Sequence, residues 1–291
     1  MTLSGYEERL LDELRAHVAA RPEPAAPPSR RRVLMAAAAV TLTAAAVTVP
    51  LVGERPAAAS AELILRDAAR AARQEPTLTA RRDQWVFTEE RAILADPVTL
   101  DRYTTVRLQQ WVPVDPGEQW RQRRWDEAIG GPWREDTIYP EMGRPLGYLG
   151  DLPTDADSML RYLREYPIDG DLPPGADLAA IEASPSRPWV TAQDFLQGYL
   201  PPPSRAALFE AMARVPGVTV VPGDVADAAG RPGIALRPSG MSGGSNDIIF
   251  DRDTFAYLGD RYLLSRDGED VLFMSTARLR TAIVDRAGDL P

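Results

Sequence analysis

Residues 84–94 read QWVFTEERAIL and residues 102–114 read RYTTVRLQQWVPV, and these two runs decide the fold class. Both are rich in aromatic and β-branched residues, and two shorter runs of the same kind follow at 119–128 and 134–140. Pro- and Gly-containing turns separate the runs, an arrangement that is typical of an antiparallel meander. Because large aromatic side chains gain most from burial, we expect this sheet to bury four tryptophans: Trp85, Trp111, Trp120 and Trp125.

Helical signals separate this meander from a second group of strands. Thr154–Asp157 and Thr191–Asp194 have the form of capping boxes, and Ser204 is expected to cap a further helix that reaches Arg214. Strands are then expected at 218–221, 233–238, 247–250, 254–264 and 271–284. The order of strands, helices and strands predicts an α+β fold, with one curved antiparallel sheet made from both strand groups and with the helices on one face.

A candidate membrane span precedes the fold. Val33–Val52 is a stretch of 20 residues without a charge, and at 1.5 Å per residue a helix of this length covers about 30 Å, the thickness of a bilayer core. Arg30–Arg32 stand directly before it, whereas Glu54 and Arg55 cancel on the other side. The positive-inside rule therefore predicts a cytoplasmic N-terminus and an extracytoplasmic C-terminal domain, with the lipid bilayer as a partner.

This topology divides the chain into four parts. After the span, a helix is expected from Ser60 to about Gln74, and Pro76 ends it. The expected parts are a short cytosolic tail (1–32), a transmembrane helix (33–52), a juxtamembrane helix and linker (53–80) and an extracytoplasmic α+β domain (81–291).

Export followed by cleavage is the alternative for the same residues. Ser29–Leu34 (SRRRVL) is similar to a twin-arginine export motif, and Ala57–Ala59 and Ala59–Ala61 both satisfy the small-x-small rule for signal cleavage. Cleavage would release a soluble protein. The retained anchor is favoured because the 32 residues before the span are longer than most signal-peptide heads and carry a helical apolar stripe of their own, Tyr6, Leu10, Leu14 and Val18. This stripe could dock a cytosolic partner.

The composition excludes several chemistries. The chain has no Cys and a single His, His17, so that thiol nucleophiles, disulfides, zinc–thiolate sites and multi-His metal sites are absent. Its formal charge is 33 − 42 = −9, and every basic residue is Arg. Trp120–Trp125 alternates aromatic and basic residues as single-strand nucleic-acid binders do. In an acidic chain an amphipathic strand explains that segment better, and we expect no nucleic-acid partner.

Motifs for catalysis have simpler structural explanations. Gly240–Gly244 matches G-x-S-x-G, but strands are expected on both sides of it and His17 lies before the predicted span, so that an exposed hairpin loop holding Ser242 is expected. Glu89 and Glu90 lie one on each face of a strand. Three pairs of acids offer oxygens that Ca²⁺ would accept, but none continues into an EF-hand pattern: Asp155/Asp157, Asp169/Asp171 and Asp251/Asp253. The first pair falls in the first turn of an expected helix, and the third looks like a turn former between strands. We therefore assign no catalytic, cofactor-binding or metal-binding residue, and expect no enzyme.

Several segments together resemble an actinobacterial family of uncharacterised single-pass membrane proteins. They are the Arg-rich flank with its Ala-rich span, Ala59–Leu65, Trp85–Thr88, Leu152–Asp155, Pro203–Phe209, Val215–Val218, Ile249–Asp251 and Tyr257–Gly259. The resemblance covers most of residues 30–265 and implies topology and architecture, without a functional residue. The Phe250–Thr254 turn is also similar to the curved-sheet domains of periplasmic lipoprotein carriers and of regulators that restrain anti-sigma factors.

The sequence thus predicts a single-pass protein of the plasma membrane whose extracytoplasmic domain is a binding, sensor or regulatory module for an unidentified protein partner or ligand. One alternative is an exported soluble protein or enzyme released by signal cleavage. Another is a carrier of an apolar ligand in the concave face of the sheet, which predicts a wide pocket lined by aromatic side chains.

Overall fold

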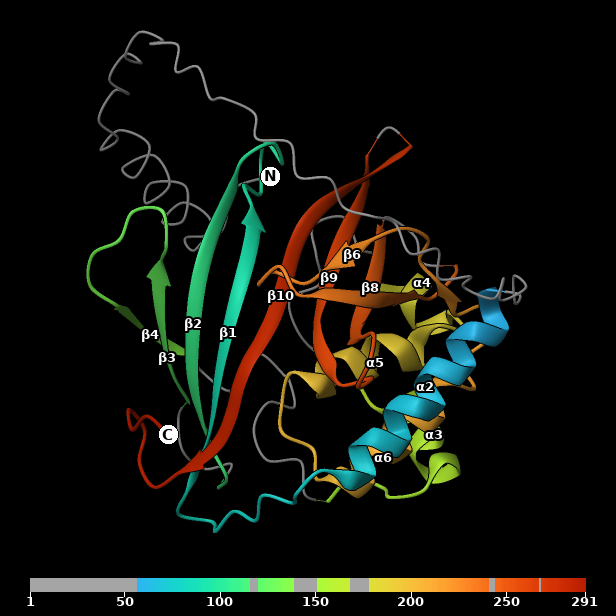
Figure 1. Ribbon diagram of the computed structural model, residues 1–291, viewed down its shortest axis with the longest axis horizontal. Helices are drawn as coiled ribbons and strands as arrows, with labels where there is room; N and C mark the ends of the chain where they lie inside the picture. Colours follow the sequence, from blue (N-terminus) through green and yellow to red (C-terminus); the bar gives the residue numbers. More distant parts are fainter. Residues whose placement is uncertain (1–56, 116–119, 139–150, 168–177, 241–243, 267) are drawn as a thin grey trace, which may run out of the picture. The chain divides into compact units, whose positions relative to one another are not determined.

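The computed structural model describes residues 57–115, 120–138, 151–167, 178–240, 244–266 and 268–291 (Figure 1). The chain divides into two compact units, 1–52 and 53–291, and all described residues belong to the second. The predicted tail and span at 1–52 lie outside the described residues. Within the described part of the chain, no helix combines the length and the apolarity that a membrane crossing requires.

The described residues of the second unit form one open antiparallel sheet of ten strands. Its strands are β1 (Trp85–Ala95), β2 (Tyr103–Pro113), β3 (Trp120–Asp126), β4 (Arg134–Ile138), β5 (Thr219–Val220), β6 (Val225–Ala226), β7 (Pro232–Arg237), β8 (Gly244–Asp251), β9 (Tyr257–Arg266) and β10 (Glu269–Val284). The order is β4-β3-β2-β1-β10-β9-β8-β7-β5, and β6 pairs with β7. Because β10 pairs with both β1 and β9, it joins the two strand groups, and this confirms the prediction of one sheet.

The pairing of β1 with β10 contains a β-bulge that matters for the site. Glu89 lies opposite Arg280 and Glu90 lies opposite Arg278, so that the register shifts by one residue between the two glutamates. A bulge of this kind bends the strand and increases its twist. Successive side chains of a strand point to opposite faces, and Glu89 accordingly pairs with Arg107 whereas Glu90 pairs with Arg278.

The helices gather at the β8–β9 side of the sheet, away from β2–β4 (Figure 1). They are α2 (Ala57–Gln74), α3 (Ala156–Glu165), α4 (Leu178–Ala183), α5 (Arg187–Leu196) and α6 (Pro202–Met212). Leu65, Leu163 and Phe209 from the helices share one buried apolar core with Leu236 and Phe250 from the strands. The neighbouring strand residues on the opposite face form a separate small cluster, Val225, Ala235, Ile249 and Leu258. The described helices therefore cover one face of the β7–β8 region, as predicted.

The helix starts differ from the predicted caps. At α3, Asp155 is the N-cap and its carboxylate accepts from the backbone N–H of Ser158 at 2.9 Å, one residue after the expected Thr154. At α5, the helix begins at Arg187, with proline in its first turn, and Thr191 lies within it. A proline ring already has the φ of a helix and lacks the N–H that a first turn leaves unpaired, so it starts a helix without a capping side chain.

Two further serines are not caps. Helix α6 begins at Pro202, and the Ser204 hydroxyl instead donates to the carbonyl of Leu152 at 3.0 Å, tying α6 to the segment before α3. Helix α2 begins at Ala57, before the expected Ser60. Alanine has the highest helix propensity, so an Ala-rich segment extends the helix past its polar residue.

The tryptophans are buried less uniformly than predicted. Trp111 is buried beside Phe87, with ring centroids 5.4 Å apart, and its indole N–H donates to the carbonyl of Asp289 at 2.7 Å. The C-terminal residues thus cover this part of the sheet. The other three are only partly buried, Trp85, Trp120 and Trp125. The prediction was wrong for these three: Trp120 and Trp125 lie on β3, beside the edge strand β4, and Trp85 packs at the margin of the small cluster of Phe87, Trp111 and Val284.

Candidate functional site

A pocket of about 440 Å³ opens at the junction of the helices and the sheet. Its walls come from five segments that are distant in sequence: 68–78, 196–200, 205–209, 255–257 and 278–281. These segments belong to α2 and the chain after it, the α5–α6 connection, α6, the β8–β9 turn and β10. We call this the α2–β10 pocket. Its volume lies in the range of small-molecule binding sites, roughly 300–1,000 Å³.

Most of the pocket lining is apolar. On the α2 side, Ala68 and Ala72 stand one helical turn apart and their small side chains leave space between α2 and the sheet. The opposite walls carry four aromatic residues, Tyr199, Phe209, Phe255 and Tyr257. An apolar or aromatic group would lose its contact with water against these walls, which is the main driving force for binding in such a site.

Phe255 enters the pocket wall from a strained turn. Its φ is +57°, in the left-handed region that bulky side chains rarely adopt. Asp251 builds this turn: its Oδ1 accepts from the backbone N–H of Asp253 at 3.0 Å and of Thr254 at 2.8 Å, and its carbonyl accepts from the N–H of Phe255. The hydrogen bonds from Thr254 hold the pKa of Asp251 below its ordinary value. The turn thereby forces a bulky ring into a position that glycine would occupy more easily.

One corner of the pocket is polar. Arg205, in the first turns of α6, donates from Nη2 to Oε2 of Glu75, which follows the end of α2. Close by, the Tyr199 hydroxyl accepts from the backbone N–H of Leu78 at 2.7 Å. Both contacts join the α2 side of the pocket to the α5–α6 side, so they bridge the two walls between which an occupant would lie.

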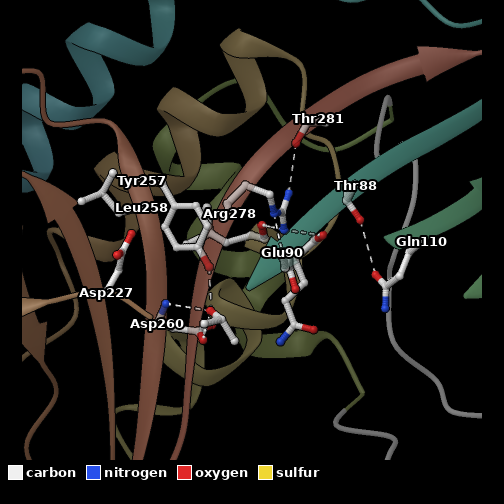
Figure 2. A network of polar contacts seen from close by, with 12 residues as sticks. Thr88, Glu90, Gln110, Asp227, Tyr257, Leu258, Asp260, Arg278 and Thr281 are labelled. Atoms are coloured by element: carbon white, nitrogen blue, oxygen red, sulfur yellow. Dashed lines mark hydrogen bonds and ion pairs between the residues drawn. The ribbon is translucent and has the colours of Figure 1, made fainter. Parts of the chain in front are cut away.

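Arg278 lines the pocket and is the centre of a network of polar contacts (Figure 2). Its guanidinium donates from Nε to Glu90 at 2.8 Å, from Nη1 to the Thr281 hydroxyl at 3.3 Å, and from Nη2 to two carbonyls at the end of α5, Leu196 and Gln197, at 3.1 and 2.7 Å. Burial is the largest single influence and lowers the pKa of Arg278, but the charges of Glu90, Tyr257 and Asp260 and the hydrogen bond to Glu90 together outweigh it, and the net pKa is raised. A cation at a helix C-terminus also favours the helix dipole. Arg278 therefore locks α5 to the sheet.

Behind the pocket lies a second buried carboxyl group. Figure 2 shows Tyr257 on β9 with its hydroxyl directed at Asp260, to which it donates at 3.5 Å. Asp260 is 2% exposed and also accepts from the Thr276 hydroxyl at 2.6 Å. Burial raises the pKa of Asp260 and the charge of Glu90 raises it further, while the hydrogen bonds of Thr276 and Gln193 oppose the shift. Burial and the charge of Asp260 likewise raise the pKa of Tyr257 well above its ordinary value.

This arrangement suits binding. The carboxylate in the pocket lining, that of Glu75, is paired with Arg205, and the two buried carboxyl groups outside the lining, Glu90 and Asp260, also have partners within the fold. Among the described residues, no three His, Asp or Glu side chains come together in a way that could hold a metal ion. The groups that an occupant would meet are therefore aromatic rings, apolar side chains, the guanidinium groups of Arg205 and Arg278, and the carboxylate of Glu75.

The structure places most of the residues that the sequence singled out. Asp155 caps α3 and Asp251 builds a turn, which confirms the structural interpretation of those two acid pairs. In β3, Arg123 stacks between Trp111 and Trp133, 5.1 and 4.7 Å from their ring centroids. Strands β7 and β8 flank the G-x-S-x-G segment and pair antiparallel, as predicted. Two of the candidates lie outside the described residues, Ser242 and the Asp169/Asp171 pair, and so does His17.

The residues of the α2–β10 pocket escaped the sequence analysis. They come from five segments and form no motif, since each contributes only two to five positions to the lining. One signal was available: Phe255 follows an Asp-x-x-Thr turn at a position where glycine or asparagine is common. A bulky residue at such a position points to a requirement for its side chain.

Comparison with known proteins provides weak likenesses only. No family model matches the chain, and no curated protein matches it. Among solved structures, a crystal structure of MucB aligns with 80% of this chain and 60% of its own length, at 17% identity and a TM-score of 0.28. The Pseudomonas aeruginosa MucA/MucB complex aligns with 80% of this chain and 58% of its own chain, at 15% identity and a TM-score of 0.28. MucB in complex with MucA(peri) aligns with 77% of this chain and 56% of its own chain, at 13% identity and a TM-score of 0.27. The chain thus spans about 60% of the MucB length, and at these TM-scores no function carries over from MucB.

Proposed function

We propose that the chain is a single-pass protein of the plasma membrane whose extracytoplasmic unit is a ligand-binding regulatory module, with the α2–β10 pocket as its binding site. The observation that carries this proposal is the position of α2. This helix begins at Ala57, five residues after the predicted span ends at Val52, and its Ala68 and Ala72 form one wall of the pocket.

Such a wall would link binding to the membrane segment. The buried face of α2 packs into the core through Leu65, Ala69 and their neighbours, so that the helix has a defined position in the absence of an occupant. An occupant that spreads the Glu75–Arg205 and Leu78–Tyr199 contacts would shift the C-terminal part of α2. Because packed helices move as rigid bodies, the shift would reach the first turn of α2 and the residues before it.

The absence of cysteine makes the movement directly measurable. Single cysteines for spin labels can be placed at Arg66 on the exposed side of α2 and at Arg280 on β10, both of which are exposed. We expect the distance between the labels to change when the neutral dye N-phenyl-1-naphthylamine saturates the full-length protein in detergent. A control pair on the sheet, at Arg121 and Arg280, should not change. Saturable dye binding with an unchanged Arg66–Arg280 distance would refute the regulatory coupling.

The predicted topology has its own test. Reporter fusions after Val18 and after Gly288 should report opposite sides of the membrane, with Val18 cytoplasmic. Mass spectrometry of the membrane fraction should find an intact chain that retains residues 1–52. A mature protein beginning near Ala59 or Ala61 would instead support the alternative of an exported soluble protein.

The carrier hypothesis is the second candidate, favoured by the four aromatic residues of the lining. The wide cavity that it predicts over the sheet is not present above β7 and β8, where Leu236, Ile248 and Phe250 pack directly against the helices. A carrier must release its ligand to an acceptor. Transfer of bound dye to apolar vesicles faster than its spontaneous dissociation would favour the carrier over the regulatory module.

A further inference from the structure

We propose that the α2–β10 pocket selects apolar organic anions, and that Arg205 is the residue that binds their acid group. This inference rests on the proposed function, because it names the ligand class of the same site. Arg205 belongs to the pocket lining and its side chain is 20% exposed. Its Nε–H is buried, and none of the described residues accepts a hydrogen bond from it.

Two charged side chains of the pocket differ in what they still offer to a ligand. Every nitrogen of Arg278 donates to an acceptor of the fold, namely Glu90, Thr281 and the end of α5. Arg205 uses Nη2 on Glu75, and its Nε edge lacks an acceptor among the described residues. A guanidinium presents its N–H groups as a planar fork that matches the two oxygens of a carboxylate, sulfonate or phosphate. A buried donor without a partner is costly, so an acid group that accepts from it would bind favourably.

The remaining lining defines the other end of the ligand. Phe209 stands one helical turn after Arg205 on α6, and Phe255 faces the same space from its strained turn. An acid group bound at Arg205 would therefore have an aromatic or aliphatic body beside it. The carboxylate of Glu75, which is 45% exposed, competes with the acid group of the ligand for the guanidinium of Arg205.

Two naphthalene dyes that differ mainly in one acid group test the proposal. 1-Anilinonaphthalene-8-sulfonate carries a sulfonate, and N-phenyl-1-naphthylamine has the same ring system without it. Both are titrated into the full-length protein in detergent, with fluorescence as the readout and near-ultraviolet circular dichroism to confirm that tertiary structure is retained. We expect the sulfonate dye to bind about 10- to 100-fold more tightly, the factor expected of a hydrogen bond to a charged group.

Variants of the polar corner then assign the selectivity. Arg205→Met should remove the preference for the sulfonate dye and change the binding of the neutral dye by less than about threefold. Glu75→Gln should act in the opposite direction, because it releases Nη2 of Arg205, and the sulfonate dye should bind several-fold more tightly. Since Glu75 is half-exposed and its replacement conservative, this second variant keeps the test informative if Arg205→Met fails to fold.

A matched control exists on the same two helices. The Arg73–Glu210 ion pair, 2.7 Å long, also joins α2 to α6, but neither residue lines the pocket. Arg73→Gln should leave the binding of both dyes unchanged. Equal affinities of the wild-type protein for the two dyes, or a preference for the sulfonate that survives Arg205→Met, would overturn the proposal while leaving the binding function intact. Failure of both dyes to bind would overturn the proposed function as well.

Discussion

Arg278 and Glu90 form an ion pair of 2.8 Å between β10 and β1, with side chains that are only 11% and 15% exposed. The pair lies at the β-bulge of the β1–β10 ladder, where the shifted register places the two residues opposite each other. Because the same guanidinium also holds the last carbonyls of α5, a single side chain connects both strand groups with the helical layer.

This pair leads to a prediction for stability. Arg278→Met leaves Glu90 as a buried charge without its counterion, and we expect the free energy of unfolding to fall by about 3–5 kcal/mol. The double variant Arg278→Met/Glu90→Met removes both charges and should lose less than the single variant. Urea denaturation measures both. As a control, Arg81→Gln breaks exposed ion pairs with Asp83 and Asp285 and should have no measurable effect. A double variant less stable than Arg278→Met would contradict the argument.

Asp260 predicts a pH dependence. Its pKa in the folded protein is raised above the ordinary 3.8, chiefly by burial, so the folded state binds the proton more tightly than the unfolded state. The stability from this group is complete below about pH 3.8 and is lost as the pH rises through the raised pKa. Asp260→Asn cannot ionise, and its stability relative to the wild type should therefore increase as the pH rises from 4 towards 8. A difference in unfolding free energy that does not vary with pH would show that Asp260 remains charged in the fold.

Phe255 allows backbone strain to be separated from side-chain contacts. Phe255→Gly and Phe255→Ala both remove the ring, but only alanine retains the penalty of a positive φ. We expect the glycine variant to be more stable than the alanine variant by about 1 kcal/mol in chemical denaturation. Both should bind N-phenyl-1-naphthylamine more weakly than the wild type. An alanine variant as stable as the glycine variant would mean that the turn relaxes to a negative φ.

The cap of α3 distinguishes two neighbouring residues. Asp155→Ala removes the acceptor for the Ser158 N–H and should lower the melting temperature at pH 7, whereas Thr154→Ala should not. The hydrogen bonds from Ser158 lower the pKa of Asp155. The stabilisation by this carboxylate is therefore present above pH 3.8 and is lost as the pH falls through the lowered pKa. Circular dichroism melts at two pH values would test both statements.

Ser242 gives a prediction about chemistry. It belongs to the connection between β7 and β8, two paired antiparallel strands, where a nucleophile elbow would need a following helix. Ser242→Ala should change the free energy of unfolding by less than about 0.5 kcal/mol, as for surface sites without special contacts. It should also leave dye binding unchanged. Covalent labelling of Ser242 by a fluorophosphonate probe would establish an activated serine and contradict the view that this motif is a hairpin loop.

The local features of this protein were predictable from residues that are neighbours in the chain. Alternating aromatic and β-branched runs such as 85–95 and 103–113 became strands, because period-two patterning depends on neighbouring residues only. The antiparallel sheet, the α+β class and the turn role of Asp251 follow from signals within a few residues of one another. Helix starts were harder to predict, since Pro202 begins α6 and Pro188 lies in the first turn of α5, and neither start has the polar cap that short motifs detect.

The candidate site, in contrast, is assembled by contacts between residues that are distant in the chain. The α2–β10 pocket unites Ala72, Arg205, Phe255 and Arg278, whose separations of 133, 50 and 23 residues leave no pattern that a sequence motif could contain. Arg205 keeps a donor for a ligand, whereas Arg278 has none left. This difference depends on which acceptors the folded chain brings to each guanidinium. The two side chains are chemically identical, and burial and partners are properties of the packed core, which long-range contacts alone create.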